Sequence, residues 1–509
     1  MTAVTLTGQD LTLDAVVAVA RGGRSAVLAP GARRAVARCH TLLQDMIADG
    51  TPIYGVTTGF GALDGAAVPA EANQAQQHNL LRSHAAGTGP AMPDDQVRAM
   101  LLLRANVLAT GMTGVAPATL DALLAMLAAG VLPVVPERGS VGACGDLAPL
   151  AHLALPLIGG GHARIGGAVL PGADALALAG IDPPAIAGRD GIALINGTEQ
   201  TTAIGCLAVA DALALVRIAE AVSALTLEAV GAVDDAFDER TALAKPHPGQ
   251  IATSAALRHW TAGSLSVRPP RASRLRDALS LRCIPQVLGA VRDGLDHAAS
   301  VLTVEINAAN DNPLFGVDDG WVTSNSGNFH GQAAAQALDG ATTAVTSLAV
   351  IAERRAARLV DANHNGGLTA FLIHPDARPG ENSGFMIAQY TAAALVAELR
   401  SQAVPASIQS VPTCANTEDH VPMAPLAARR AAQAVTLARD VVAIEALLAA
   451  QALDLRGIDP APNLRPLMAA IRTAVPMMVT DRVLAHDITA VHAALFGPDA
   501  APLGPAAPA

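Results

Sequence analysis

Long stretches of helical periodicity constrain the fold of this chain more than any other feature of its sequence. Within each stretch apolar residues recur at helical spacing, and Gly and Pro are scarce. The stretches are Thr198–Val233, Pro285–Ala309, Gly331–Asp361, Gly384–Ala403 and Ala424–Leu455, the last of which is interpreted as a pair of helices. Segments of this length predict a bundle of long helices whose axes are nearly parallel.

The composition favours the same architecture. Of the 509 residues, 51% are hydrophobic but only 2% are aromatic, so Ala, Leu and Val must supply most of the core. Small side chains suit closely packed helices better than an all-β design. We expect a mainly α protein with three successive parts: an N-terminal region at 1–200, a central long-helix bundle at 201–405 and a C-terminal helical region at 406–509.

Charge and hydropathy argue against several classes of partner. The formal net charge is −11 and no Lys/Arg-rich run is present, so we expect no nucleic acid and no anionic membrane as partner. The N-terminus lacks the basic segment of a signal peptide. The most apolar stretch, Val435–Leu453, is interrupted by Arg439, Asp440 and Glu445, so we expect no membrane span.

The five cysteines are widely scattered and none forms a CxxC pair. This spacing fits a reduced, cytoplasmic protein better than a disulfide framework or a zinc site, and we expect no metal.

Shorter patterns predict local structure outside the long stretches. We expect a short helix at Leu13–Ala20 and helical structure from Pro93 to Gly130. Asp146 is placed to cap a helix over Leu147–Ile158. The Pro/Ala/Gly-rich tail after Gly497 is expected to fray.

A glycine-punctuated loop, GSVGACGDLAPLAH at 139–152, carries the most specific chemistry. If the backbone bends tightly, the amide nitrogen of Gly145 can attack the carbonyl carbon of Ala143 and close a five-membered ring. Only small residues permit that approach. Loss of water and of the leaving group on the β-carbon of Cys144 would give a conjugated methylene, which is a strong electrophile. The tripeptide by itself favours an ordinary loop that contains a small buried cysteine, and the whole run at 139–152 reverses that preference.

The loop and seven further segments resemble, in order along the chain, the histidine, phenylalanine and tyrosine ammonia-lyase and aminomutase family. The segments are YGVTTGFG from Tyr54, LINGTE around Asn196, SLRCIPQ around Arg282, EINAANDNP at 305–313, GNFHGQ at 327–332, NSGFM at 382–386 and TCANTEDHVPM at 413–423. The resemblance implies a long-helix bundle of the ammonia-lyase (fumarase/aspartase-like) type, with the first 200 residues bearing the electrophile.

The resemblance also implies a cofactor made by the chain itself. The family's prosthetic group is 4-methylidene-imidazol-5-one (MIO), which would form here autocatalytically from Ala143, Cys144 and Gly145 with no external cofactor. The family usually has Ala-Ser-Gly, whereas this chain has Cys144 in the middle. Maturation would therefore expel hydrogen sulfide in place of a second water, and a thiol can leave by β-elimination at least as readily as a hydroxyl.

Three further residues take catalytic roles by resemblance. Tyr54 is the expected base, and its phenol must then titrate well below the ordinary pKa of about 10. Asn196 can hydrogen-bond the MIO oxygen or the substrate carboxylate. Glu418 falls where histidine-acting members carry a glutamate near the amine or the ring of the substrate.

The expected substrate-binding residues are six. Arg282 should hold the substrate carboxylate through two parallel hydrogen bonds, which a lysine could not replace well. His84 matches the pair that faces the substrate side chain, and Phe329 is either a pocket wall or part of the core. The rest of the set is Gln332, Arg276 and Leu279.

Arg276 and Leu279 depart from the family pattern. The segment before Arg282 normally reads Gln-Asp-x-Tyr-Ser-Leu-Arg, so Arg276 replaces Gln and Leu279 replaces a tyrosine whose hydroxyl lies beside the MIO and the substrate. Two interpretations stay open for Arg276: it points outward from a divergent loop, or it engages a second anionic group on the substrate.

The expected reaction is elimination of ammonia from an L-α-amino acid to give the α,β-unsaturated acid, with histidine as the first candidate substrate and an aromatic acid as the second. The alternatives are a 2,3-aminomutase, a lyase for a non-standard and possibly anionic amino acid, and a non-catalytic relative. The resemblance implies a homotetramer with active sites assembled from several subunits.

Overall fold

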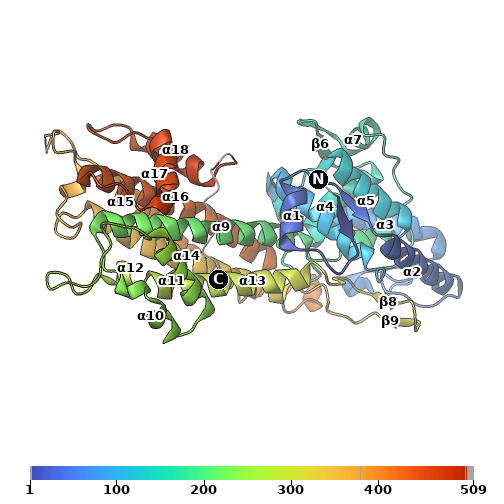
Figure 1. The fold of residues 1–509 in the computed structure, drawn as a ribbon. Coiled ribbons are helices and arrows are strands. Elements are labelled where there is room, and N and C mark those ends of the chain that lie inside the picture. The colour runs from blue at the N-terminus through green and yellow to red at the C-terminus, as the bar shows by residue number, and fades with distance from the viewer. Residues whose placement is uncertain (1–2, 379, 499, 501–509) are drawn as a thin grey trace. The chain divides into compact units, whose positions relative to one another are not determined.

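The computed structural model describes residues 3–378, 380–498 and 500, and helices dominate it (Figure 1). The chain forms two compact units, each gathered from three separate segments. The site unit comprises Met1–Ala210, Ala298–Asp339 and Pro405–Ala432, and the bundle unit comprises Asp211–His297, Gly340–Val404 and Gln433–Ala509.

The site unit combines short helices with small sheets. Its helices are α1 (Leu13–Ala20), α2 (Pro30–Ala48), α3 (Asn73–His84), α4 (Asp94–Ala109), α5 (Pro117–Ala129), α6 (Leu147–Ala154), α7 (Gly172–Leu178) and α8 (Asp190–Ile195). Its strands are β1 (Val4–Leu6), β2 (Ala26–Leu28), β3 (Thr88–Ala91), β4 (Leu132–Pro133), β5 (Pro136–Arg138), β6 (His162–Ile165), β7 (Ala168–Pro171), β8 (Leu314–Gly316) and β9 (Trp321–Thr323). Strands β1 and β2 pair in parallel, whereas β3–β5, β8–β9 and the three-stranded sheet β4-β6-β7 are antiparallel.

The long helices give most of their length to the bundle unit. They are α9 (Glu199–Val230), α13 (Ile284–Glu305), α14 (Gln332–Val360), α15 (Met386–Gln402) and α16 (Ala424–Arg456). The shorter helices of this unit are α10 (Glu239–Leu243), α11 (Pro248–Trp260), α12 (Leu279–Arg282), α17 (Arg465–Ala474) and α18 (Leu484–Phe496). Alanines on α16, including Ala443, Ala446 and Ala450, are fully buried, which lets neighbouring helices approach closely.

Ion pairs whose carboxylates are buried join the long helices to one another in the bundle unit. Glu220 of α9 pairs with Arg292 of α13 at 2.6 Å, and Arg355 of α14 pairs with Glu445 of α16 at 2.6 Å. The hydroxyl of Thr226 on α9 also donates to Glu445, at 2.8 Å. Because Arg355 and Glu445 are both fully buried, each depends on the other for compensation of its charge.

Most of the predicted helices are confirmed, and two predictions are wrong. The last long stretch is one helix of 33 residues, α16, because no Gly or Pro follows Pro425 to interrupt it. The stretch from Pro93 to Gly130 is broken into α4 and α5, where Gly111 and Gly114 adopt positive φ. The tail predicted to fray after Gly497 lies largely outside the described residues.

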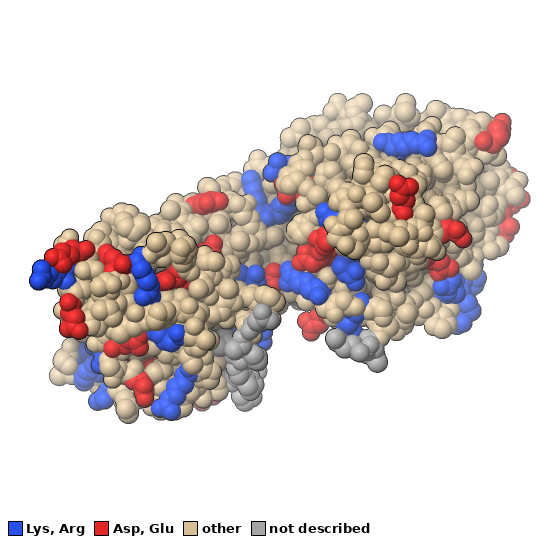
Figure 2. Space-filling view, turned by 90° about the horizontal axis from the view of Figure 1, so that it is seen from above, with Lys and Arg blue, Asp and Glu red and all other residues tan. Residues whose placement is uncertain are grey.

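One apolar helical stretch of the described chain, Asp190–Val230, is long and apolar enough to cross a membrane by length and composition. Its most apolar 18-residue window is 67% buried inside the protein, as a core helix also is. The most apolar stretch is therefore not Val435–Leu453, as the sequence suggested. On the face seen in Figure 2, blue Lys and Arg residues are interspersed with red Asp and Glu residues.

Candidate active site

The loop at 139–146 is bent and firmly anchored in the site unit. Gly142 and Gly145 have φ of 74° and 65°. The carbonyl oxygen of Val141 accepts from the amide of Met423 at 2.9 Å, and that of Gly142 accepts from the amide of Gly331 at 3.1 Å. The loop is therefore held in a tight conformation before any chemistry takes place.

Gly145 has no room for a side chain. A β-carbon at this position would lie 2.2 Å from the carbonyl oxygen of Gly197. Within the described part of the chain the Gly145 amide nitrogen donates no hydrogen bond, whereas the next amide, that of Asp146, donates to Gly197 at 2.6 Å. Ala143 is buried at 2% exposure. The nucleophilic nitrogen and the carbonyl it would attack thus belong to small residues in a constrained turn, as ring closure requires.

Asp146 does not have the role predicted for it. It stands at the N-cap position of α6, but its side chain makes no capping hydrogen bond there. The carboxylate accepts from the amide of Thr201, in the first turn of α9, at 2.8 Å, and from the hydroxyl of Ser140 at 2.8 Å. Burial raises the pKa of this carboxyl to about 6, although both hydrogen bonds act in the opposite direction.

Cys144 faces a cavity of about 1210 Å³ in the site unit. Its thiol donates to Oε1 of Glu418 at 2.7 Å, and the other carboxylate oxygen of Glu418 accepts from the hydroxyl of Thr413 at 2.8 Å. Burial raises the pKa of the Cys144 thiol well above its usual range, and the contact with Glu418 raises it further. Cys144 is therefore a protonated thiol at neutral pH.

Tyr54 lines the same cavity, and its oxygen accepts a hydrogen bond from the amide of Gly61 at 2.8 Å. The ring packs edge-to-face against Phe60, with centroids 6.4 Å apart. Burial raises the pKa of the phenol, and the Gly61 amide offsets this only in part. This direction is opposite to the one expected for a base, because no cation of the described site unit lies close enough to favour the phenolate.

Asn196 lies at the C-terminal end of α8 and reaches the cavity from a buried position. Its side-chain amide donates to Oδ1 of Asp311 and to the carbonyl oxygen of Asn312, both at 3.0 Å. With both amide hydrogens engaged, Asn196 offers the cavity its carbonyl oxygen, an acceptor, in place of the donor that the resemblance implies.

Asp311 organises this side of the cavity. It forms a bidentate pair with Arg189, two contacts of 2.7 Å, and both side chains are fully buried. Arg104, also fully buried, pairs with Glu199 at 2.7 Å and lies 3.9 Å from Asp311. Sequence reasoning did not single out Asp311, although it belongs to the EINAANDNP segment, whose acidic residue between two asparagines was the available signal.

The remaining wall of the cavity is rich in histidine. His84 lines it, and so does Phe329, for which the sequence left pocket wall and core both open. His330 and His420 line it too, and their rings stack at a centroid distance of 5.7 Å. Burial lowers the pKa of His84, so this imidazole is neutral at neutral pH. His330 and His420 were not among the predicted residues.

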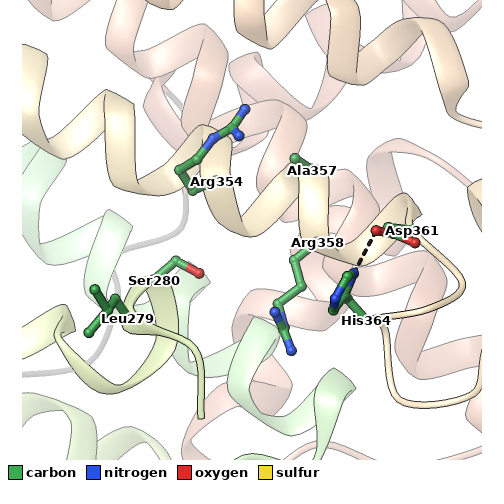
Figure 3. Close-up of a pocket in the computed structure, with 7 residues that line it drawn as sticks. All are labelled: Leu279, Ser280, Arg354, Ala357, Arg358, Asp361 and His364. Carbon is green, nitrogen blue, oxygen red and sulfur yellow. Dashed lines mark hydrogen bonds and ion pairs between the residues drawn. The ribbon is translucent and has the colours of Figure 1, made fainter.

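Four predicted substrate-binding residues do not line this cavity. Gln332 begins α14, and its carboxamide oxygen is buried with no hydrogen-bond partner among the described residues. Leu279, Arg276 and Arg282 belong to the bundle unit. Leu279 is 62% exposed and borders a small pocket with Ser280, Arg354 and Arg358 (Figure 3).

Arg276 and Arg282 share a second pocket of about 320 Å³ in the bundle unit. Both are exposed, and neither side chain has a hydrogen-bond or ion-pair partner in the part of the chain that the structure describes. The neighbouring Asp277 is already paired with Arg274 at 2.7 Å and accepts from the amide of Val233. Two guanidinium groups are thus free to bind an anion.

The residues around 143–145 fit an autocatalytic MIO. The fit rests on two observations. Position 145 has no room for a β-carbon, and Cys144 lines the cavity. Across the described residues no cluster of three or more His, Cys, Asp or Glu side chains is arranged to hold a metal ion.

Comparison with known proteins shows the family of the chain. A family model described as aromatic amino acid lyase matches residues 11–473. The chain belongs to this family, that of the MIO-dependent ammonia-lyases and aminomutases, and it is a carbon–nitrogen lyase.

Particular relatives are similar over nearly their whole length. The histidine ammonia-lyase of Symbiobacterium thermophilum is 48% identical over 485 residues, which cover 95% of this chain and 95% of that protein. Among solved structures, the tyrosine aminomutase from Streptomyces globisporus has a TM-score of 0.93 at 38% identity and covers 97% of each chain. The histidine ammonia-lyase from Trypanosoma cruzi has a TM-score of 0.89 at 35% identity, covering 97% of this chain and 93% of that one.

Proposed function

We propose that the protein is an MIO-dependent ammonia-lyase acting on L-histidine. The observation that carries the proposal is the convergence of Cys144, Tyr54, Glu418 and Asn196 on one cavity. The names of the relatives at 45–48% identity favour histidine as the substrate. Glu418 and His84 add polar groups that suit an imidazole better than a plain phenyl ring.

When formed, the MIO supplies an electrophile that makes the substrate amine a better leaving group. The residues of this chain do the rest. Tyr54 takes the β-proton, and Glu418 holds the amine or the imidazole. The carbonyl oxygen of Asn196 accepts a hydrogen bond from the amine. Because burial raises the pKa of Tyr54, a cation must approach its phenol when substrate binds, and the substrate ammonium or an arginine from another protomer would provide it.

We further propose that the active protein is a homotetramer in which a neighbouring protomer brings Arg282 to the cavity. In support, Arg282 is exposed and unpaired among the described residues, and it does not line the cavity of its own chain. A guanidinium in this role would hold the substrate carboxylate bidentately. The described cysteines are all free, which agrees with a reducing cytoplasm as the location.

A panel of L-amino acids, with products separated by chromatography, tests the reaction and the substrate together. We expect histidine to give the unsaturated acid and free ammonia. A β-amino acid as the main product would instead indicate a 2,3-aminomutase, the activity named for one structural relative. No turnover of any amino acid by a chain with the encoded, unprocessed mass would indicate a non-catalytic relative.

Arg276 favours a second candidate, a lyase for an amino acid with an additional anionic group. The specific observation is that Arg276 and Arg282 border the same pocket, both without partners among the described residues. Substitution of Arg276 by Gln, the usual family residue, tests it. If Arg276 reads a second anion, R276Q loses turnover of a dicarboxylic amino acid and gains turnover of histidine. An unchanged substrate profile would mean that Arg276 points outward from a divergent loop.

A further inference from the structure

Glu418 holds the Cys144 thiol by a hydrogen bond before any substrate binds. The Cys144 thiol and the Thr413 hydroxyl occupy one oxygen each of the Glu418 carboxylate, at 2.7 Å and 2.8 Å. A carboxylate is an acceptor only, so it favours a thiol that keeps its proton and disfavours a thiolate at the same place.

The segment that presents Glu418 is rigid before substrate arrives. Thr413 and Glu418 exchange backbone hydrogen bonds of 2.9 Å and 3.3 Å, and the three residues after Thr413 all have positive φ. The amide of Val421 donates to the hydroxyl of Ser410 at 2.8 Å. The amide of Met423 donates to the carbonyl oxygen of Val141 in the loop at 139–146, which we call the maturation loop. A strained turn of this kind persists because its surroundings over-determine it, and such turns concentrate at functional sites.

Maturation of the tripeptide, on which the proposed function rests, makes a definite demand on Cys144. The amide nitrogen of Gly145 bonds to the carbonyl carbon of Ala143, whose oxygen leaves as water with the amide protons of Cys144 and Gly145. The α-proton of Cys144 and its hydrosulfide, which keeps the thiol proton, then leave, and together they form hydrogen sulfide. A thiol departs as hydrosulfide, whereas a thiolate would have to depart as the far more basic sulfide dianion, so only the thiol is competent.

The groups around the Cys144 sulfur favour the protonated thiol over the thiolate. Glu418 contacts it, Cys414 and the phenol of Tyr54 lie close by, and the neighbouring His84 is neutral. No cation of the described site unit lies near enough to favour a thiolate. Burial and Glu418 together raise the pKa of the thiol.

We propose that Glu418, held in place by Thr413, is a positioning residue for maturation that keeps Cys144 protonated and directed into the cavity, so that its sulfur leaves as hydrosulfide. This role precedes the one that Glu418 has toward substrate and is independent of it. It is specific to a cysteine at position 144, because a serine hydroxyl does not ionise in the same range of pH.

Intact mass of newly made chains tests the proposal without any activity measurement. Full-length protein is made in a short pulse of cell-free synthesis in the cold and moved to buffers of increasing pH, and the loss of one water and one hydrogen sulfide is followed over time. The variants are Glu418→Gln, Thr413→Val and, as the matched control, Asp419→Asn, which neutralises an adjacent carboxylate lining the same cavity. Cys144→Ser, for which the expected loss is two waters, is made alone and together with Glu418→Gln.

We expect Glu418→Gln to mature more slowly than the unsubstituted chain, with a deficit that is small near neutrality and reaches roughly tenfold once the buffer lies about one pH unit above the thiol pKa of the variant, because the reactive thiol fraction then falls about tenfold per pH unit. Thr413→Val should show a weaker deficit of the same form, and Asp419→Asn should show none. When Cys144→Ser is also present, the deficit caused by Glu418→Gln should not grow with pH.

Equal maturation of Glu418→Gln and the unsubstituted chain at every pH would overturn the proposal. So would a deficit that is independent of pH and equal with and without Cys144→Ser, since that pattern belongs to a structural role. If Glu418→Gln fails to fold, Thr413→Val decides by the same criteria. An unsubstituted chain that keeps its encoded mass refutes the proposed function itself, which is a different result.

Discussion

Gly145 lies against the backbone of Gly197, and this contact explains why position 145 of the maturation loop is a glycine. Its φ of 65° is disfavoured for other residues, and a β-carbon would lie 2.2 Å from a carbonyl oxygen. Conformational strain and steric exclusion are separate effects, and a second glycine allows them to be separated by experiment.

Gly145→Ala should prevent maturation and lower the free energy of unfolding by at least about 2 kcal/mol, because strain and overpacking add. The matched control is Gly180→Ala, where φ is 67° but no atom lies within 4 Å of the added β-carbon. Denaturant unfolding and intact mass check both variants. Equal losses of stability, or a mature Gly145→Ala chain, would contradict the steric account.

Asp146 should make stability depend on pH. Its pKa is raised from 3.8 to about 6 in the folded protein, so the unfolded chain releases this proton first as pH rises. The contribution of Asp146 to the free energy of unfolding is therefore full below about pH 4 and falls by about 3 kcal/mol between about pH 4 and pH 6.

Asp146→Asn removes this titration. The free energy of unfolding of the unsubstituted protein, minus that of the variant, should therefore decline across the same window. Urea titrations at closely spaced pH values measure it. A difference that stays flat from about pH 4 to pH 6 would show that burial does not perturb Asp146 as described.

At the scale of elements, the long helices of the bundle unit depend on a few buried polar contacts between otherwise apolar faces. Arg355 and Glu445 join α14 to α16 with no exposure to solvent. Removing one partner leaves the other as an uncompensated buried charge, which is costlier than losing the whole pair.

Glu445→Gln should lower the free energy of unfolding by about 3–5 kcal/mol, since Arg355 keeps its charge in a buried position. The control is Glu381→Gln in the bundle unit, where Glu381 (66% exposed) pairs with Arg378 (82% exposed). This substitution should change the free energy of unfolding little. Thermal unfolding of the two variants side by side makes the comparison, and similar shifts in Tm would argue against a structural role for the buried pair.

The sequence predicted the long helices because apolar periodicity over many residues is a strong local signal. It did not predict the continuity of α16 or the break between α4 and α5, since these depend on how individual glycines are used in the packed structure. In the same way, the residue types at Tyr54, Cys144 and Glu418 indicated the proposed chemistry, and the structure places all three at one cavity. The engagement of both Asn196 amide hydrogens by Asp311 and Asn312, and the capping of α9 by Asp146, arise from contacts between distant segments that no local pattern encodes. The division into three successive regions stays a prediction.

At the scale of the whole molecule, the proposed homotetramer would assemble each active site from more than one protomer. Tyr54 belongs to the site unit, while Arg282 belongs to the bundle unit and lines a different pocket. If a neighbouring protomer provides the arginine, two inactive variants can complement each other in one oligomer.

Tyr54→Phe should reduce turnover by about 10²–10⁴-fold, as loss of a general base does, and Arg282→Lys should reduce it by removing bidentate binding of the carboxylate. Co-expression of the two variants should restore measurable turnover, because some sites then combine an intact Tyr54 with an intact Arg282. Mixing the separately purified oligomers is the control. Mixed oligomers as inactive as their parents would contradict shared sites.

The central claim is that Ala143, Cys144 and Gly145 cyclise to form the electrophile. Intact mass spectrometry of the freshly purified, full-length chain measures this directly. We expect a chain lighter than its encoded mass by one water and one hydrogen sulfide, with the change mapped to the peptide that contains residues 143–145. A chain at its full encoded mass, with Cys144 still open to alkylation, would contradict it.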